Sequence, residues 1–332
     1  MKITVLMGGT SSERNVSLAS GIRIVQALRS KGHKVVALDP ARGVIDAAGE
    51  KALASGTVGT EPPTIESLAK VAADAFLPNL TAMKEITEAD VVFLGLHGGQ
   101  GEDGTIQALL DMAGVSYTGS GHLSSALAMD KDLSKILFRA ADVKTADWLM
   151  APVTIEQVEG ILGLPVVVKP SKQGSTVGLS LVKKREDIQP AIEEALKYDD
   201  EVMIERFVAG RELTVGVLGD MALPVGEIIP KHEIYDYECK YTAGMAVEEF
   251  PAKISPKATE QVQQQALAAF KALKLRGCAR IDFRLTSDGE FYCLEANTLP
   301  GMTELSLIPQ GAAAMGISFP DFCERVAKLA LE

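Results

Sequence analysis

The sequence predicts a mixed α/β and α+β fold, with a parallel α/β domain at the N-terminus and further sheets after it. Apolar strands at 3–7 and 91–96 are each followed by a Gly-rich loop and a helical pattern, which is typical of parallel βα units. Near the C-terminus, alternating segments flank Asp288-Gly289, a strong hairpin signal. The chain has 332 residues, 47% of them hydrophobic and 23% charged, and is long enough for two or three domains.

The first 120 residues are expected to form the parallel domain. Its first helix is indicated by an apolar stripe that stops at Gly32, whereas the stretch from 40 to 90 carries mixed signals. The expected elements are, in chain order, a strand at 3–7, a helix with Leu18, Ile22, Val25 and Leu28 on one face, a strand at 34–38, a helix around 67–75, a strand at 91–96 and a helix at 105–113.

The rest of the chain is expected to be a helical connector followed by α+β structure, with a polar, Tyr-rich segment at 232–245. The expected elements are a helix with Leu133, Ile136, Leu137 and Ala140 on one side, strands at 166–169, 179–182, 202–205, 213–218 and 223–229, a helix that buries Ile188, Ile192 and Leu196, a helix striped by Val262, Ala266, Ala269 and Leu273, and a hairpin at 280–297 whose apolar side carries Ile281, Phe283, Leu285, Tyr292, Leu294 and Ala296.

Composition favours a soluble enzyme and argues against several other classes. The net charge of −11 does not suit a general nucleic-acid binder, which needs a basic surface, but it allows a local basic pocket. No apolar run is long enough to cross a membrane, and the first strand is too short for a signal-peptide core, so a cytoplasmic location is expected. The four cysteines form no CxxC pair, so neither a disulfide framework nor a zinc site is expected.

Two carboxylates are predicted to face each other in the C-terminal hairpin. If 288–289 form a two-residue type I′ loop, Asp282 faces Glu295 and Arg280 faces Asn297. Like charges directly opposite destabilise a sheet, whereas a divalent cation between them reverses the sign of their interaction. Two carboxylates and an amide carbonyl suit Mg²⁺ that keeps open positions for phosphate. The alternative is the solvated outer face of an ordinary hairpin.

The hairpin and the turn after it resemble a known family. Arg-Ile-Asp at 280–282 and Leu-Glu-Ala-Asn-Thr-Leu-Pro-Gly-Met-Thr at 294–303 look like the metal-binding end of the ATP-grasp ligases, and in detail like the D-alanine–D-alanine ligases. Further motifs follow in the expected order from Gly8 to the C-terminal helix. The resemblance implies a substrate domain at 1–120 and an ATP-grasp fold after it, with a central subdomain at 121–210 and a C-terminal subdomain at 211–332.

The resemblance assigns the first substrate to two loops at one edge of the first sheet. Gly-Gly-Thr-Ser-Ser-Glu-Arg at 8–14 looks like the loop that holds the amino group of the first D-alanine through Glu13. The loop at 97–104 brings His97 near the same substrate. From the residues alone, Glu13 reads more simply as an acid that favours a helix N-terminus, and a lone histidine is usually structural.

The resemblance also implies an ATP site. The Gly-rich stretch at 169–178 follows an apolar strand and is able to close over phosphate as a backbone nest, although a plain hairpin or a kinase-like loop would read much the same. By resemblance, the residues assigned to ATP are Lys131, Lys169, Lys240 and the backbone of Ser175 and Thr176 for the phosphates, Glu205, Arg206, Phe207 and Val208 for adenine, and Glu212 for the ribose.

By the same resemblance, the chain is expected to be an enzyme that joins two D-alanines through an acyl phosphate, for the peptidoglycan precursor. Arg280 and the Gly301 N–H would stabilise the tetrahedral oxyanion. The remaining catalytic and substrate residues are a hydrogen-bonded triad of Glu13, Ser175 and Tyr241, and Ser306 with Leu307 at the carboxylate of the second D-alanine.

The cofactors implied are ATP and two Mg²⁺ ions, with Mn²⁺ as a substitute. The ions are assigned to Asp282 and Glu295, and to Glu295 and Asn297. Neither nucleic acid nor membrane is expected as a partner, and a homodimer is common in the family. A related ligase that uses D-lactate or D-serine as second substrate, an ATP-grasp phosphotransferase and a nucleotide-binding module without turnover stay open as alternatives.

Overall fold

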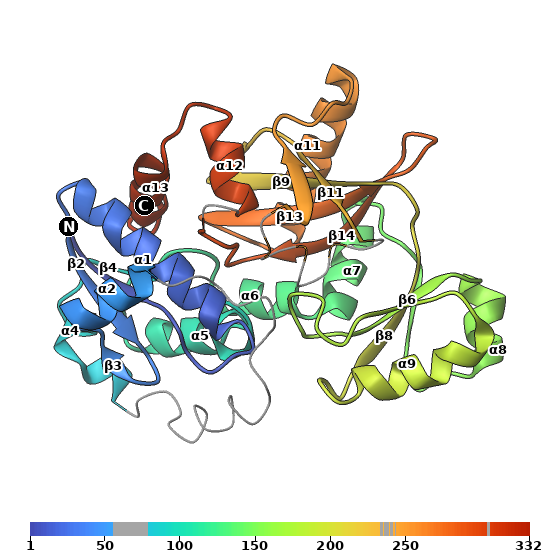
Figure 1. The fold of residues 1–332 in the computed structure, drawn as a ribbon, viewed down its shortest axis with the longest axis horizontal. Helices are drawn as coiled ribbons and strands as arrows, with labels where there is room; N and C mark the ends of the chain where they lie inside the picture. The colour runs from blue at the N-terminus through green and yellow to red at the C-terminus, as the bar shows by residue number, and fades with distance from the viewer. Residues whose placement is uncertain (56–78, 233–234, 236–238, 240–241, 243, 304–305) are drawn as a thin grey trace.

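The computed structural model describes residues 1–55, 79–232, 235, 239, 242, 244–303 and 306–332. The described chain forms three sheets with helices around them (Figure 1). The helix predicted around 67–75 lies outside the described residues.

The N-terminal sheet has the strand order β3-β2-β1-β4. β1 pairs in parallel with β2 and β4, as predicted, whereas the short β3 runs antiparallel to β2. Neighbouring side chains of β1 point to opposite faces, so Val5 packs with Leu28 of α1 and Leu6 packs with Leu110 of α5. The elements are β1 (Lys2–Leu6), α1 (Arg14–Ser30), β2 (Lys34–Asp39), β3 (Gly43–Val44), α2 (Ala47–Ser55), η1 (Leu80–Ala82), α4 (Lys84–Thr87), β4 (Val91–Leu94), η2 (Gly99–Gly101) and α5 (Thr105–Met112).

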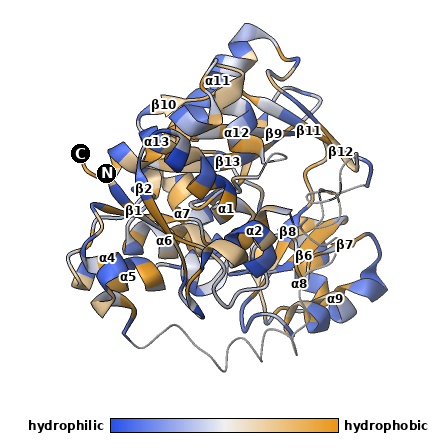
Figure 2. Cartoon of the chain, turned by 60° about the vertical axis from the view of Figure 1, so that its left-hand side comes forward, coloured by the Kyte–Doolittle hydropathy of each residue, from blue (hydrophilic) through white to orange (hydrophobic). Residues whose placement is uncertain are grey.

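The second sheet is antiparallel, with the order β5-β8-β6-β7. Its strands are largely hydrophobic, while the outer side of α9 is hydrophilic (Figure 2). Ile188 and Ile192 of α9 are buried against the sheet as predicted, but Leu196 lies beyond the end of the helix and is 49% exposed. The elements are β5 (Trp148–Met150), α8 (Ile155–Gln157), η3 (Val158–Leu162), β6 (Val166–Pro170), β7 (Ser180–Val182), η4 (Arg185–Asp187), α9 (Ile188–Ala195) and β8 (Val202–Arg206).

The third sheet has the order β12-β11-β9-β13-β14, with β10 paired to β9. Val262, Ala266 and Ala269 of α11, and Leu273 directly after it, are buried in its core, as predicted. The elements are β9 (Arg211–Leu218), β10 (Met221–Ala222), β11 (Gly226–Pro230), β12 (Ala246–Glu249), α11 (Pro256–Ala272), β13 (Cys278–Leu285), β14 (Phe291–Asn297), α12 (Leu307–Ala313) and α13 (Phe319–Leu329).

The hairpin of β13 and β14 has the predicted pairing at its polar end and a different turn. Asp282 faces Glu295 and Arg280 faces Asn297, as predicted. The two-residue loop is wrong, because the Thr286 N–H donates to the Glu290 carbonyl and leaves three residues between them.

A bulge in β14 compensates for the extra residue of the loop, so the pairing register at the polar end is the predicted one. Phe283 faces Cys293, whereas the next pair toward the polar end is Asp282 with Glu295, so Leu294 is the additional residue of a bulge. Between the bulge and the turn the two faces of β14 are therefore exchanged relative to the prediction. Phe291 and Cys293 belong to the apolar core, where Tyr292 was expected.

One predicted helix face is wrong. α7 (Lys131–Ala140) follows α6 (His122–Met129), and its Leu133 and Ile136 are 43% and 49% exposed. The buried side carries Lys135 and Phe138 instead. Because the Lys135 ammonium group is paired inside the protein, the side of the helix that reads as polar faces the interior.

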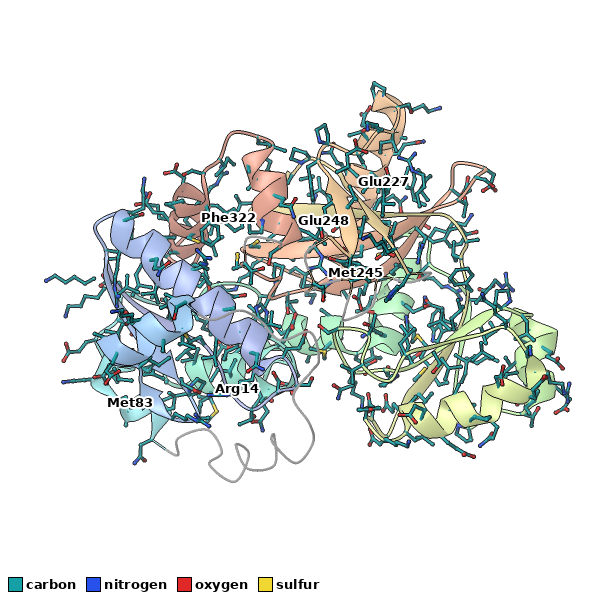
Figure 3. The ribbon with its side chains drawn as sticks, viewed as in Figure 1. Arg14, Met83, Glu227, Met245, Glu248 and Phe322 are labelled. Carbon is teal, nitrogen blue, oxygen red and sulfur yellow. The ribbon has the colours of Figure 1, made fainter. Side chains whose placement is uncertain are left out.

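The C-terminal helix returns to the first domain, so the two ends of the chain lie near each other (Figure 1). Phe322 of α13 is buried in the same hydrophobic cluster as Val25 and Leu28 of α1 (Figure 3). Among the helices that the structure describes, none combines the length and the apolar character that a membrane crossing requires.

Candidate active site

Two adjoining cavities form the candidate site. The inter-sheet cavity is lined by strands of both antiparallel sheets, including β6, β8, β9 and β13. The turn cavity is lined by the loops after β1 and β4 and by the turn after β14. Six residues line both cavities: Lys131, Gln173, Ser175, Tyr235, Arg280 and Glu295.

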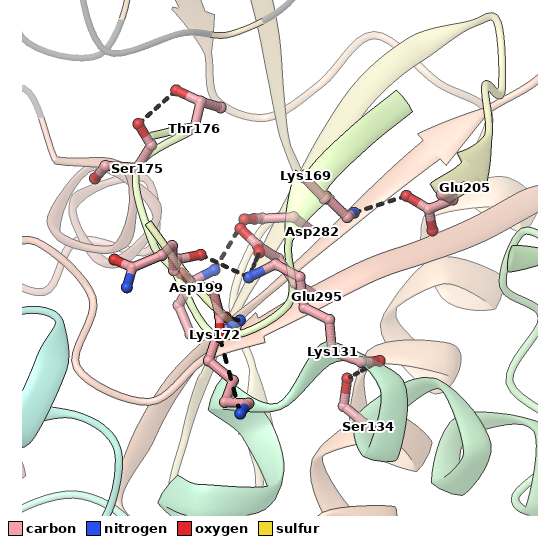
Figure 4. Close-up of polar contacts among 12 residues, drawn as sticks. Lys131, Ser134, Lys169, Lys172, Ser175, Thr176, Asp199, Glu205, Asp282 and Glu295 are labelled. Carbon is pink, nitrogen blue, oxygen red and sulfur yellow. Dashed lines mark hydrogen bonds and ion pairs between the residues drawn. The ribbon is translucent and has the colours of Figure 1, made fainter. Parts of the chain in front are cut away.

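Glu205, near the end of β8, is buried between two lysines at the inter-sheet cavity. Lys169 Nζ donates to one carboxylate oxygen at 2.7 Å (Figure 4). Lys135 donates to the other oxygen. Lys135 is fully buried and also donates to Thr145 Oγ1 at 2.6 Å. Burial alone would raise the pKa of Glu205, but the two ammonium groups lower it to about 2. The ionised carboxylate therefore fixes Lys169 at the wall of the cavity.

The negative charge of Asp282 is compensated by neighbouring hydrogen-bond donors. Repulsion from Glu295 is therefore not its only interaction. Arg280 donates to both of its oxygens, at 3.0 Å from Nε and 2.8 Å from a terminal nitrogen. Thr214 and Asn297 donate to the same carboxylate at 2.7 and 3.0 Å. Burial alone would lower the pKa of Arg280, but Asp282 raises it above its ordinary value.

The Gly-rich stretch between β6 and β7 bends over both cavities. Ser175 and Thr176 have φ angles of 49° and 59°, in the left-handed region that residues other than glycine rarely adopt. Lys131 Nζ donates to the Gln173 carbonyl at 2.8 Å and lies 3.5 Å from Glu295. Strained backbone of this kind is concentrated at ligand-binding segments, which is consistent with a loop that contacts a ligand.

Glu13, just before α1, lies between two glycine-containing loops. Ser175 Oγ donates to its carboxylate. A Cβ atom at Gly98 or Gly174 would come within 2.6 or 2.8 Å of Glu13 Oε2, so a larger residue at either position would displace the carboxylate. The turn cavity thus has a buried carboxylate in its wall.

His97 and Glu102 connect the first domain to the turn after β14. The ring of His97 contacts the Leu299 carbonyl through Nδ1 at 2.8 Å and Ser20 Oγ through Nε2 at 3.0 Å. Glu102 accepts the N–H groups of Gly98 and Leu299, both at 3.1 Å. Burial lowers the pKa of His97, and burial together with nearby Glu13 raises the pKa of Glu102 to about 7.

Gly301 and Ser306 come together in the turn after β14. Ser306 Oγ accepts the Thr303 N–H at 2.8 Å. A Cβ atom at Gly301 would lie 2.7 Å from that Oγ, so glycine permits the close approach. Ser306 and Leu307, at the start of α12, therefore line the same cavity as Gly301.

Comparisons with known proteins identify the family. The profile described as D-ala D-ala ligase N-terminus matches residues 2–120, and the one described as D-ala D-ala ligase C-terminus matches residues 132–328. The chain belongs to the D-alanine–D-alanine ligase family. It is 42% identical over 328 residues to the D-alanine–D-alanine ligase of Geobacter sulfurreducens, covering 98% of this chain and 92% of the relative. The ligase of Halalkalibacterium halodurans is 39% identical over 340 residues and is covered completely, as is this chain.

Solved structures agree with this membership. The crystal structure of D-alanine–D-alanine ligase from Bacillus anthracis has a TM-score of 0.76 and 31% identity, and the match covers 100% of this chain and 97% of that one. The same protein complexed with ATP has a TM-score of 0.78 and 29% identity, with the same coverage. The family and the ATP-grasp fold expected from the motifs are therefore confirmed.

The structure gathers most residues that the ligase motifs assign, and their individual roles stay predictions. Lys240 and Tyr241 lie outside the described residues. The inter-sheet cavity is lined by Lys131, Lys169, Ser175, Thr176, Glu205, Arg206, Phe207, Val208, Glu212, Arg280, Asp282 and Glu295. The turn cavity is lined by Glu13, His97, Lys131, Ser175, Arg280, Glu295, Asn297, Gly301, Ser306 and Leu307.

Gln173, Tyr235 and Glu102 are among the lining residues that were not predicted from the sequence. Gln173 and Tyr235 line both cavities, and Glu102 lines the turn cavity. Glu102 had a usable signal, because it is an acid in a Gly-rich loop at the same sheet edge as Glu13. Gln173 and Tyr235 stand in segments that the ligase motifs had marked only for other residues.

Proposed function

We propose that this protein joins two D-alanine molecules to D-alanyl-D-alanine with ATP, through an acyl phosphate, for the peptidoglycan precursor. The observation that carries the proposal is a pair of adjoining cavities that differ in part of their charged lining. Lys169 lines only the inter-sheet cavity and the buried Glu13 and Glu102 line only the turn cavity, while six residues are common to both. A phosphoryl group bound in one cavity would therefore lie next to an amino acid bound in the other.

The inter-sheet cavity suits ATP. Lys131 and Lys169 supply positive charge for the phosphates, and the loop containing Thr176 supplies backbone groups near them. The residues from Glu205 to Val208 offer backbone groups to adenine, and Glu212 offers a carboxylate to the ribose. The related ligase from Bacillus anthracis has been solved complexed with ATP, which supports the same use of this cavity. Lys240 is proposed as a further phosphate-binding lysine.

The residues Asp282, Glu295 and Asn297 fit magnesium. Two carboxylates and an amide carbonyl are hard oxygen donors, and Mg²⁺ bound to few side chains keeps positions for phosphate and water. Asn297 uses its amide nitrogen toward Asp282, which leaves its carbonyl oxygen as a ligand atom. In the described part of the chain no three His, Cys, Asp or Glu side chains cluster, so phosphate oxygens would complete the shell. Two such ions, or Mn²⁺ in their place, would neutralise phosphate charge.

The turn cavity suits two amino acids. Glu13 attracts the ammonium group of the first D-alanine, and Arg280 lies where negative charge would develop on the reacting carboxyl group. The Gly301 N–H is the second donor proposed for this oxyanion. Ser306 and Leu307 hold the carboxylate of the second D-alanine, and Tyr241 extends the contact between Ser175 and Glu13. The protein orients these groups, and no covalent side-chain nucleophile is required.

Cytoplasmic location and a homodimer complete the proposal. The precursor reaction consumes ATP, which the cytoplasm supplies, and dimers are common in the family. A size measurement in solution tests the dimer independently of activity.

A competition assay tests the reaction itself. The protein is mixed with ATP, Mg²⁺ and equal amounts of D-alanine and D-lactate at pH 6 to 9, and ADP and the condensed products are quantified. D-alanyl-D-alanine is expected to predominate at pH 7, with no product from L-alanine. Predominant formation of the D-lactate ester, or of D-alanyl-D-serine when D-serine is added, would show that the second substrate is D-lactate or D-serine instead of D-alanine. ADP formation without any condensed product would contradict the ligase reaction.

A further inference from the structure

Ser20 occupies a central position behind the turn cavity. It lies on α1, is fully buried, and has hydrogen-bond partners on two segments far away in the sequence. Its Oγ is 3.0 Å from His97 Nε2 and accepts the N–H of Met302 at 3.2 Å. The other ring nitrogen of His97 is 2.8 Å from the Leu299 carbonyl. One serine and one histidine of the first domain thus contact both sides of the Pro300-Gly301 pair.

The donors and acceptors in this series of hydrogen bonds follow from the two backbone groups at its ends, the Leu299 carbonyl and the Met302 N–H. The Leu299 carbonyl can only accept, so His97 Nδ1 must carry a proton. In a neutral imidazole the Nε2 then accepts, and the Ser20 hydroxyl is its donor. Because its proton is used toward His97, the Ser20 oxygen accepts the Met302 N–H. For a neutral imidazole, only the Nδ1–H tautomer satisfies every link, whereas in the cation Nε2 would donate to the Ser20 oxygen.

We propose that Ser20 is a positioning residue that, with His97 in its neutral Nδ1–H tautomer, fixes the turn that presents the Gly301 N–H to the reacting carboxyl group. This inference rests on the proposed function, since it assigns a purpose to the Gly301 N–H. His97 then acts through the turn, because both of its ring nitrogens are occupied by protein partners.

Other contacts keep the same turn in place and define what Ser20 adds. Glu102 accepts the Leu299 N–H, so Leu299 is held through both its N–H and its carbonyl. Met302 lies on the other side of Gly301, and Ser20 is its partner. Removing the Ser20 hydroxyl would leave the first anchor in place and free the second. The charged groups that act on His97 are Glu13, which favours its cation, and Arg280, which opposes it.

The tautomer of His97 can be measured without any assay of activity. The chain has four histidines, so the ring-nitrogen NMR signals of His97 are identified by their loss in His97→Gln. A protonated Nδ1 and an unprotonated Nε2 at pH 7 are expected for the wild-type protein. A protonated Nε2, either in the other tautomer or in the cation, would overturn the inference.

Kinetics of Ser20→Ala test the positioning role. We expect kcat to fall roughly tenfold, since an oxyanion donor is misplaced, while KM for ATP stays within about twofold. The matched control is Ser125→Ala, which also removes a fully buried helical hydroxyl, one whose partner is the Ser120 carbonyl. Its kcat should be unchanged. Equal losses in both variants, or unchanged kcat in Ser20→Ala, would reduce Ser20 to a structural residue.

Two further measurements keep the inference separable from folding and from the proposed function. If Ser20→Ala does not fold, Ser20→Cys retains a weak donor and acceptor, and an intermediate kcat is expected. Unchanged kcat in Ser20→Cys would contradict the inference. If the wild-type protein forms no D-alanyl-D-alanine, the proposed function fails, and with it the purpose assigned to Ser20. If the dipeptide forms but His97 has the other tautomer, only the inference fails.

Discussion

Glu102 and Glu205 are both buried glutamates at the edge of the candidate site, yet they are expected to titrate about five pH units apart. The pKa of Glu205 is lowered to about 2 by Lys135 and Lys169, which outweigh its burial. The pKa of Glu102 is raised to about 7 by burial, and its hydrogen-bond donors include two backbone N–H groups. The same side chain is thus held as a firm anion in one cavity and as a readily protonated acid in the other.

The difference reflects the charge of what each cavity is proposed to bind. Near Glu205, Lys135 is fully buried, whereas Lys169 lines the cavity in which phosphates are proposed to bind, so the Glu205 carboxylate positions Lys169 there. Near Glu102, the charged groups that shift its pKa are Glu13, which raises it, and Arg280, which lowers it. Such a site favours an ammonium group over another anion.

Breaking the lysine pair should have the largest effect on stability. Lys135→Met removes one of the two cations that compensate Glu205 and should lower the free energy of unfolding by about 3 kcal/mol. Lys135→Met/Glu205→Gln should recover part of that loss, because it removes the buried anion as well. Chemical denaturation at pH 7 measures both variants.

The control for this experiment is Lys144→Met, which removes an exposed lysine paired with Glu290. Its effect on the free energy of unfolding should be much smaller than that of Lys135→Met, because an exposed ion pair contributes little to stability. A Lys135→Met protein as stable as this control would show that Glu205 does not depend on its second lysine.

Asp282→Asn tests the catalytic side of the inter-sheet cavity. Turnover should fall roughly a hundredfold, or about 2.7 kcal/mol in the barrier, because one of two metal carboxylates is lost. Stability should fall too, since Arg280 loses its charged partner. Steady-state rates at saturating Mg²⁺ and a denaturation curve give both numbers. Asp288→Asn, at the exposed tip of the same hairpin, should match the wild type. A near-normal kcat in Asp282→Asn would remove Asp282 from the metal site.

The polar end of the hairpin could be predicted from the sequence, but its turn could not. The prediction paired Asp282 with Glu295 correctly even though the loop has three residues, because the bulge at Leu294 restores the register. This bulge has no sequence signal of its own, because it does not visibly interrupt the alternation of polar and apolar residues. The error appears only between the two irregularities, where Cys293 is in the core and Tyr292 is not.

The sequence also did not predict which charged side chains are buried. Alternation and helical periodicity place apolar side chains inside, so Leu133 and Ile136 were expected on the packed side of their helix, and nothing predicted that Lys135 is buried. The reverse holds because Glu205, seventy positions away, supplies a buried partner. The site residues were not affected by this error, because the resemblance identifies them by the order of motifs along the chain and not by predicted burial.

The smallest of the predicted effects concerns Glu102. Its folded-state pKa of about 7 lies above the ordinary value of 4.5, so the folded protein binds this proton more tightly than the unfolded chain does. Its contribution to stability therefore grows as the pH falls from 7 toward 4.5, by about 2 kcal/mol between pH 7 and pH 5. Glu205, with a lowered pKa, contributes the opposite slope, which appears only as the pH falls through 4.5 toward 2.

Glu102→Gln isolates this contribution, because the glutamine cannot titrate. Denaturation curves at pH 5 and pH 7 should show that the wild type gains about 2 kcal/mol relative to the variant on going to the lower pH. The comparison uses the difference between the two proteins, so other groups that titrate in both cancel. Glu186→Gln, which alters an exposed carboxylate, should retain the wild-type pH dependence. If Glu102→Gln retains it as well, Glu102 is ionised in the folded protein, and the contrast between the two glutamates disappears.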